Sequence, residues 1–133
     1  MCQNLRLLYL GENSFSGIIS QEIIGLLNLY IFSLPQDHFL GSLPKDVGIL
    51  INLEYIDIYE NMLFSEILAS LVSCIKLEYL DMHGNFFHGA IPSSLSSLRV
   101  LTELYLSDNL SGAIPEFLEH LNFFESLNLT YNN

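Results

Sequence analysis

Acidic and aromatic side chains occupy alternate positions in two segments of this chain, 24 residues apart: Tyr55, Asp57, Tyr59, Tyr79, Asp81 and His83. Asp81 and His83, taken with Ser107 further along, have the side-chain types of a hydrolytic triad. Asp57 and Asp81 have the charge to share a cation. Either chemistry requires that the fold bring these residues together, so it depends on the elements that carry them.

A regular repeat organises those elements. Leucines open successive repeats 24 residues apart, and a sixth start follows 23 residues after the last of them: Leu5, Leu29, Leu53, Leu77, Leu101 and Phe124. A period of this length indicates a solenoid of stacked coils. We therefore expect residues 1–133 to form one domain of five 23–24-residue repeats and a partial sixth, with no cap, transmembrane segment or kinase in this chain.

The composition narrows the class of partner. Half of the residues are hydrophobic and 14% are charged, a balance typical of a folded chain. A formal net charge of −11 repels nucleic acid and anionic membrane and favours a cationic partner. No apolar run reaches the length of about 18 residues that a spanning helix needs. The first residues also lack the pattern of a secretory signal, so we expect no nucleic-acid binding and no direct membrane insertion by this chain.

The segment after each repeat leucine alternates apolar and variable residues, which indicates a half-buried strand. The residues expected to point inward are Leu8, Leu10, Phe32, Leu34, Ile56, Ile58, Leu80, Met82, Leu104, Leu106, Leu127 and Leu129. Stacked coils would join these strands into a parallel sheet. The variable residues would then form its outward side, which we call the strand face.

Asparagine or aspartate follows each expected strand at an equivalent position: Asn13, Asp37, Asn61, Asn85, Asn109 and Asn132. An asparagine amide both donates and accepts, so a stack of asparagines can pair with backbone groups left open at each turn. We expect these residues to form a structural ladder. An ionised Asp37 cannot donate, which predicts a weak point in the second coil.

The two cysteines occupy the same repeat position, three coils apart. Neighbouring strands lie about 4.8 Å apart, so their sulfurs are expected roughly 14 Å apart, too far for a disulfide. Leucine fills this position in other repeats. Cys2 and Cys74 are therefore each expected to be a small buried apolar residue.

The later part of each repeat carries a glycine and an isoleucine–proline pair, clearest in Leu110-Ser-Gly-Ala-Ile-Pro115 and Phe87-His-Gly-Ala-Ile-Pro92. This signature, over essentially the whole chain, resembles the plant-type extracellular leucine-rich repeat. The runs 91–98 and 127–133 resemble late repeats of plant receptor-like kinase ectodomains, those of immune pattern-recognition receptors above all. The resemblance implies an α/β fold, a right-handed solenoid with a parallel β-sheet on its concave face and short 3-10 or irregular convex segments.

That family uses its concave strand face for recognition, and strand alternation places tyrosines and acids outward on this face. The expected ligand-binding residues are Tyr9, Tyr55, Asp57, Tyr59, Tyr79, Asp81, His83, Glu103 and Tyr105. Tyrosine offers a large contact area with a polar tip, and carboxylates favour partners that carry arginine or lysine. The alternative is a merely solvated face, because tyrosine is a good strand former on any pleated surface.

Other chemistries fit this face less well. An open sheet surface offers no evident oxyanion hole or exclusion of water, so no catalytic residue is expected. No calcium-loop spacing supports a metal site, and no cofactor is implied. Of two glycosylation sequons, Asn109 is expected to face inward in the ladder, whereas Asn128 faces outward and could carry sugar in a secreted chain.

The resemblance implies non-catalytic recognition of a protein or peptide, with a basic ligand and a possible co-receptor. The chain would be a piece of a receptor-like kinase ectodomain on the extracellular face of the plasma membrane, although it has no signal peptide of its own. One alternative is a soluble inhibitor of a secreted hydrolase, similar to the polygalacturonase-inhibiting proteins. Another is an inactive truncated receptor fragment. Binding to a basic peptide favours the receptor, and inhibition of a pectin-degrading enzyme favours the inhibitor.

Overall fold

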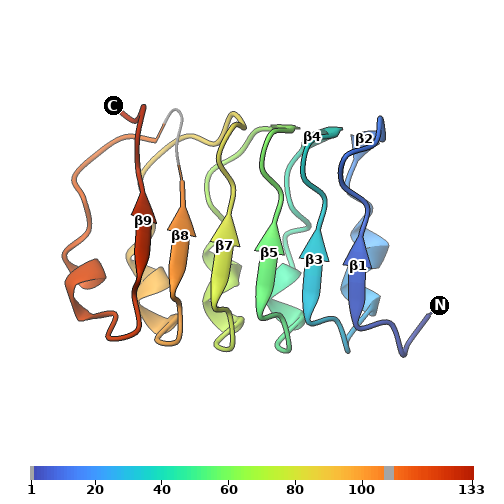
Figure 1. The fold of residues 1–133 in the computed structure, drawn as a ribbon, viewed down its shortest axis with the longest axis horizontal. Coiled ribbons are helices and arrows are strands. Elements are labelled where there is room, and N and C mark those ends of the chain that lie inside the picture. The colour runs from blue at the N-terminus through green and yellow to red at the C-terminus, as the bar shows by residue number, and fades with distance from the viewer. Residues whose placement is uncertain (1, 107–109) are drawn as a thin grey trace.

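The computed structural model describes residues 2–106 and 110–133 and consists of a row of stacked coils, with the chain termini at opposite ends (Figure 1). Each coil contributes one short strand to a parallel six-stranded sheet: β1 (Leu7–Tyr9), β3 (Ile31–Ser33), β5 (Tyr55–Asp57), β7 (Tyr79–Asp81), β8 (Glu103–Tyr105) and β9 (Ser126–Asn128). The strands pair in chain order and in a constant register, so that equivalent residues of successive repeats lie side by side.

The outer bends of the first three coils form a second parallel sheet, made of β2 (Ser16–Ile18), β4 (His38–Gly41) and β6 (Met62–Leu63). The return path of each coil holds a 3-10 helix: η1 (Gln21–Gly25), η2 (Val47–Ile49), η3 (Ala69–Ser73), η4 (Ser93–Ser97) and η5 (Glu116–His120). These helices lie behind the six-stranded sheet in Figure 1. The expected α/β solenoid, with a parallel sheet on one side and short 3-10 helices on the other, is confirmed. In the part of the chain that is described, no helix has the length and apolarity to cross a membrane.

The core lies between the sheet and the 3-10 helices. The repeat leucines Leu29, Leu53, Leu77 and Leu101 are each 0% exposed, since every one of them is covered by a coil on both sides. Leu127, which the alternation also places on the inner side of its strand, is 43% exposed. It lies on β9, where no further strand pairs with the sheet, so one flank of its side chain meets solvent.

The two cysteines differ in their surroundings. Cys74 is buried, and its thiol donates to the carbonyls of Val47 and Leu50 at 3.8 and 3.7 Å. Burial raises the pKa of this thiol to about 11, which keeps it protonated and inert. Cys2 is exposed, so the expectation that it would be buried is wrong. Cys2 precedes β1, the edge strand of the sheet, so no neighbouring strand covers it.

The asparagines after the strands join successive coils. Asn61 accepts the backbone N–H of Phe39 at 3.0 Å and donates to the carbonyl of Leu34 at 2.7 Å, both in the preceding coil. Asn85 repeats this arrangement one coil later, and Asn132 repeats it at the C-terminal end. Asn13 is exposed in the first coil, and Asn109 lies outside the described residues.

Asp37 occupies the equivalent position in the second coil, but only one of its two carboxylate oxygens has hydrogen-bond partners. Its Oδ1 accepts the N–H groups of Asn13 and Phe15 at 3.2 and 3.1 Å. Its Oδ2 is buried and finds no hydrogen-bond partner among the described residues. A carboxylate oxygen therefore occupies the place where the amide group of an asparagine would donate.

Candidate binding site on the strand face

Two aspartates lie side by side at the middle of the strand face. The parallel register of β5 and β7 pairs Asp57 with Asp81, and their exposed fractions are 7% and 5%. Strand alternation predicted that both would be exposed, and this prediction is wrong. Both point outward from the core, but the rings of neighbouring residues cover them. The two carboxylates are therefore shielded from water while they remain on the outer surface of the sheet.

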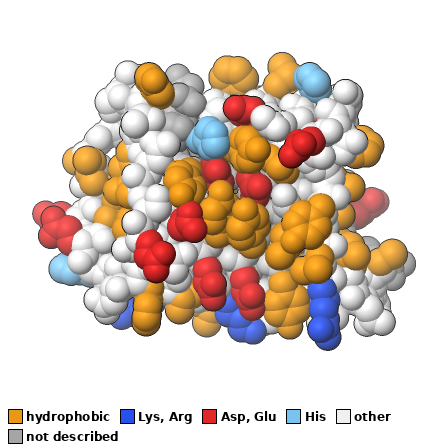
Figure 2. Space-filling model, in the orientation of Figure 1, with side chains coloured by type: hydrophobic (Ala, Val, Ile, Leu, Met, Phe, Trp, Pro, Cys, Tyr) orange, Lys and Arg blue, Asp and Glu red, His pale blue; other side chains and the backbone are white. Residues whose placement is uncertain are grey.

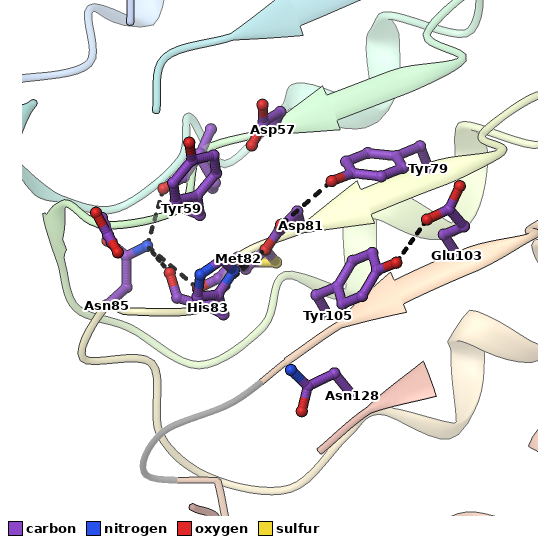
Figure 3. A network of polar contacts seen from close by, with 12 residues as sticks. Asp57, Tyr59, Tyr79, Asp81, Met82, His83, Asn85, Glu103, Tyr105 and Asn128 are labelled. Carbon is purple, nitrogen blue, oxygen red and sulfur yellow. Dashed lines mark hydrogen bonds and ion pairs between the residues drawn. The ribbon is translucent and has the colours of Figure 1, made fainter. Parts of the chain in front are cut away.

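Aromatic rings stack across the strands on both sides of this aspartate pair, and Figure 3 shows Tyr59, Tyr79, His83 and Tyr105 around it. On one side, the rings of Tyr55 and Tyr79 stack at 4.1 Å and 7°. On the other, the rings of Tyr59 and His83 stack at 4.9 Å and 4°. Tyr105 extends the first stack, with its centroid 5.7 Å from that of Tyr79. The parallel register places equivalent aromatic residues within stacking distance, which explains why the rings pair across coils rather than along one strand.

Asp81 has partners for both of its oxygens. Its Oδ1 lies 2.6 Å from Nδ1 of His83 and accepts the backbone N–H of that residue at 3.1 Å. Its Oδ2 accepts the hydroxyl of Tyr79 at 3.2 Å. Figure 3 shows Asp81 between these two rings. Asp81 therefore holds one member of each aromatic stack in place.

Asp57 is less well satisfied than its neighbour. The hydroxyl of Ser33 donates to Oδ2 at 3.5 Å, a long hydrogen bond. Oδ1 is buried and has no hydrogen-bond partner among the described residues. Burial and the nearby charge of Asp81 raise the pKa of Asp57 from 3.8 to about 6. The backbone N–H of Tyr59, the hydroxyl of Ser33 and the imidazole of His83 act in the opposite direction and offset only part of this rise in pKa.

The tyrosine hydroxyls of the site remain neutral near pH 7. Burial raises the pKa of Tyr55, Tyr59 and Tyr79 above the ordinary tyrosine value. The pKa of Tyr105 is raised mainly by its hydrogen bond to Glu103, whose Oε2 accepts the hydroxyl at 2.6 Å. A neutral tyrosine keeps its donor, so these rings can offer hydrogen bonds as well as apolar contact.

In the space-filling view, acidic groups lie among hydrophobic side chains at the middle of this face, and Lys and Arg lie at one rim (Figure 2). Of the nine residues expected to bind ligand, eight form this cluster: Tyr55, Asp57, Tyr59, Tyr79, Asp81, His83, Glu103 and Tyr105. The ninth, Tyr9, lies apart on β1 and is 61% exposed. Its register partner is Ser33 rather than an aromatic residue, so it has no ring beside it to stack on.

Sequence reasoning did not include Ser33 in the site. The signal was available, because Ser33 precedes Asp57 by one 24-residue repeat and is therefore its cross-strand neighbour. Ser107, the third member of the triad considered above, lies outside the described residues. Asn128 is half-buried on β9, and its Oδ1 accepts the backbone N–H and the hydroxyl of Thr130 at 3.0 and 2.8 Å. Over the described ranges, no group of three or more His, Cys, Asp or Glu side chains is placed to hold a metal ion.

Known proteins agree with this architecture. The family model of the Leucine Rich Repeat matches residues 4–26 and 76–98. The ectodomain of the Arabidopsis thaliana membrane receptor kinase GASSHO1/SCHENGEN3, solved with CASPARIAN STRIP INTEGRITY FACTOR 2, is 36% identical with a TM-score of 0.94. That similarity covers 98% of this chain and 16% of the receptor chain.

Two further receptor structures are similar. The plant peptide hormone receptor RGFR1, solved with RGF2, is 30% identical with a TM-score of 0.96 over 98% of this chain and 21% of its own. The Arabidopsis receptor kinase HAESA, solved with the peptide hormone IDA and the co-receptor SERK1, is 34% identical with a TM-score of 0.88 over 93% of this chain and 22% of its own. No curated protein sequence matches the chain significantly.

The chain thus spans between 16% and 22% of the length of these three receptor chains. It shares with them the stacked coils, the parallel sheet and the repeat motif, at sequence identities of 30% to 36%. The chain contains leucine-rich repeats and has a fold similar to that of plant receptor kinase ectodomains.

Proposed function

We propose that the chain recognises a basic peptide or protein through its strand face, as part of a plant receptor-like kinase ectodomain that acts in signalling or defence. The observation that carries this proposal is the aromatic and acidic cluster on β5, β7 and β8, centred on Asp57 and Asp81. Stacked tyrosines offer a large contact surface with little conformational entropy to lose. Carboxylates among them select partners that carry arginine or lysine.

The charge of the whole chain supports the same class of partner. A formal net charge of −11 at pH 7 attracts cationic ligands over a distance and repels anionic ones. The related structures include receptors solved with a peptide hormone, and one of them also contains a co-receptor. By that analogy, we propose a non-catalytic role in which ligand binding, and contact with a co-receptor, take place on the extracellular side of the plasma membrane. Asn128 is the proposed position for a sugar.

Replacing Tyr79 by alanine tests the proposal. Tyr79 stacks on Tyr55, lies against Tyr105 and donates to Asp81, so its removal opens the centre of the cluster. Titration calorimetry with a lysine- and arginine-rich peptide should show an affinity about ten-fold lower or worse for the variant, as expected of a central aromatic contact. A charge-reversed peptide should not bind either protein.

The matched control is Tyr131→Ala. Tyr131 follows β9 and is 86% exposed, so its removal should leave the affinity unchanged. Tyr79→Phe serves as a folding control because it keeps the ring and loses only the hydroxyl. Equal affinities for the wild-type chain and Tyr79→Ala, with both folded by circular dichroism, would contradict a binding role for this cluster.

A further inference from the structure

The two ends of the six-stranded sheet have complementary edges. β1 and β9 are its outermost strands and lie at opposite ends of the row of coils (Figure 1). All six strands run parallel in one register, so the backbone groups that β9 presents outward match those that β1 presents. Neither Leu7–Tyr9 nor Ser126–Asn128 contains a proline or a charged residue, which are the usual protection of an exposed edge. Both edges are therefore open to pairing with another parallel strand.

We propose that this pairing takes place between copies of this chain, which stack head to tail. β1 of one copy continues the sheet beyond β9 of its neighbour, in the register that β1 and β3 have within one chain. This inference concerns the ends of the solenoid and does not depend on the proposed function of the strand face. Because the two contacting surfaces differ, every added copy leaves a free end, and the stack grows beyond two copies.

The hydrogen bonds between internal coils specify the backbone bonds of such a junction. Between the first two coils, the backbone N–H of Leu10 donates to the carbonyl of Ser33 at 2.9 Å. One coil beyond β9, the equivalent bond joins the N–H of Leu129 to the carbonyl of Tyr9 in the next copy. The junction thus repeats a pairing that the chain already makes between its own coils.

The asparagine ladder supplies a further bond. Asn132 donates to the carbonyl of Leu106 in the preceding coil at 2.7 Å. Asn13 lies in the first coil, and among the described residues it donates only to carbonyls of its own coil. In the stack, the amide of Asn13 reaches the carbonyl of Leu129 in the preceding copy, which is equivalent to that of Leu106. The ladder therefore continues from one copy to the next.

Apolar side chains are incompletely covered at both ends. Beside β9, a hollow of about 550 Å³ has Leu118, Phe124 and Leu127 in its lining, and Leu127 is 43% exposed. At the other end, Leu8 and Leu10 are only partly buried. In the stack, Leu8 of the next copy lies beside Leu127, as equivalent leucines do between internal coils. The contact removes apolar surface from water at both ends, which favours association.

Opposite charges meet at the same junction. Arg6 precedes β1 and Glu125 precedes β9, and both side chains are exposed. They occupy the same repeat position, so stacking places them on neighbouring coils. Arg6 is one of only four Lys and Arg residues in the chain, and its guanidinium group lies 5.9 Å from the centre of the Tyr30 ring on the strand face. The net charge of −11 repels copies at a distance, but salt screens that repulsion more than a direct contact.

Sedimentation of the whole chain tests the stack, at about 0.15 M salt and at up to about 1 mM protein. The average mass should rise continuously with concentration and pass that of a dimer. Arg6→Glu should weaken association about ten-fold, because it places two glutamates side by side at the junction. Combining it with Glu125→Arg should restore association, since the pair is then present with reversed signs. Lys45→Glu, the matched control, makes the same change of charge at an exposed residue of the second coil and should change association by less than about two-fold.

Every other outcome contradicts the stack. A monomer throughout this range shows that the edges of β1 and β9 do not pair. A dimer that grows no further indicates a two-fold contact, for which the exposed apolar residues of β2, β4 and β6 are available: Ile18, Leu40 and Met62. Ile18→Lys would abolish such a dimer, whereas it should leave the stack intact. If the charge-swapped variant does not recover while circular dichroism shows it folded, Arg6 and Glu125 do not meet.

Discussion

Replacing Asn85 by aspartate should lower the free energy of unfolding by about 3 kcal/mol or more. The amide group of Asn85 donates to the carbonyls of Ile58, Met82 and His83 at 2.9, 3.1 and 3.2 Å, and the residue is only 3% exposed. A carboxylate oxygen in this place cannot donate, so it would lie unpaired against three carbonyl oxygens. The measurement is urea unfolding at pH 7, followed by circular dichroism.

The second coil already has an aspartate, Asp37, at the position equivalent to Asn85. Asp37→Asn supplies a donor where Oδ2 is buried and unpaired, and it should raise the free energy of unfolding by about 1–2 kcal/mol. Asn122→Asp adds the same charge at an exposed position and should change stability by less than about 0.5 kcal/mol. If Asn85→Asp matches Asn122→Asp, or Asp37→Asn is destabilising, the asparagines do not hold the coils together.

The second large effect concerns Asp57 and the pH dependence of stability. Its pKa is raised from 3.8 in its ordinary state to about 6 in the folded chain, so the folded state binds this proton more tightly than the unfolded state. The resulting stabilisation is fully present below about pH 4 and is lost as the pH rises through 6. The change amounts to at most about 3 kcal/mol.

Asp57→Asn should remove this loss of stability as the pH rises. The asparagine carries no charge to repel Asp81, so the variant should exceed the wild-type chain in unfolding free energy by about 1–3 kcal/mol at pH 7. The advantage should shrink towards zero near pH 4. Urea unfolding of both proteins across this pH range gives the difference between their free energies of unfolding. Contributions from the other carboxylates are common to both proteins and cancel in this difference. A constant difference across the range, or the same curve from Asp46→Asn, which removes the same charge from an exposed residue, would show that burial of the charge at Asp57 is not the cause.

The sequence predicted those features that depend on periodicity alone. The 24-residue spacing placed equivalent residues of successive repeats beside each other, and the observed register pairs Leu8 with Phe32 and Ile56 with Leu80. The alternation of apolar residues identified which side of each strand packs into the core. Both features repeat along the chain, so each repeat supplies the same evidence again. The prediction was wrong at Cys2, which belongs to a coil with a neighbour on one side only.

The candidate site was predicted only in part, because its details depend on contacts between side chains. Alternation placed Tyr55, Asp57 and Asp81 on the outward side of the sheet, but it could not show that stacked rings would cover both aspartates. The burial of Asp57 depends on the positions of the neighbouring rings and of Ser33. The same holds for its unpaired oxygen, which is visible only once every neighbouring donor has been placed.

Cross-linking with a carbodiimide tests most directly whether a basic ligand binds on the strand face. This reagent joins amines to nearby carboxylates, so a bound lysine-bearing peptide labels the acids closest to it. We expect mass spectrometry to find the peptide on Glu54, Glu78 and Glu103, which lie at or next to the strands of the central cluster. Labelling mainly of Glu22, Glu116 and Glu119, which are exposed on the 3-10 helices, would place the ligand on the opposite side of the solenoid and contradict the account.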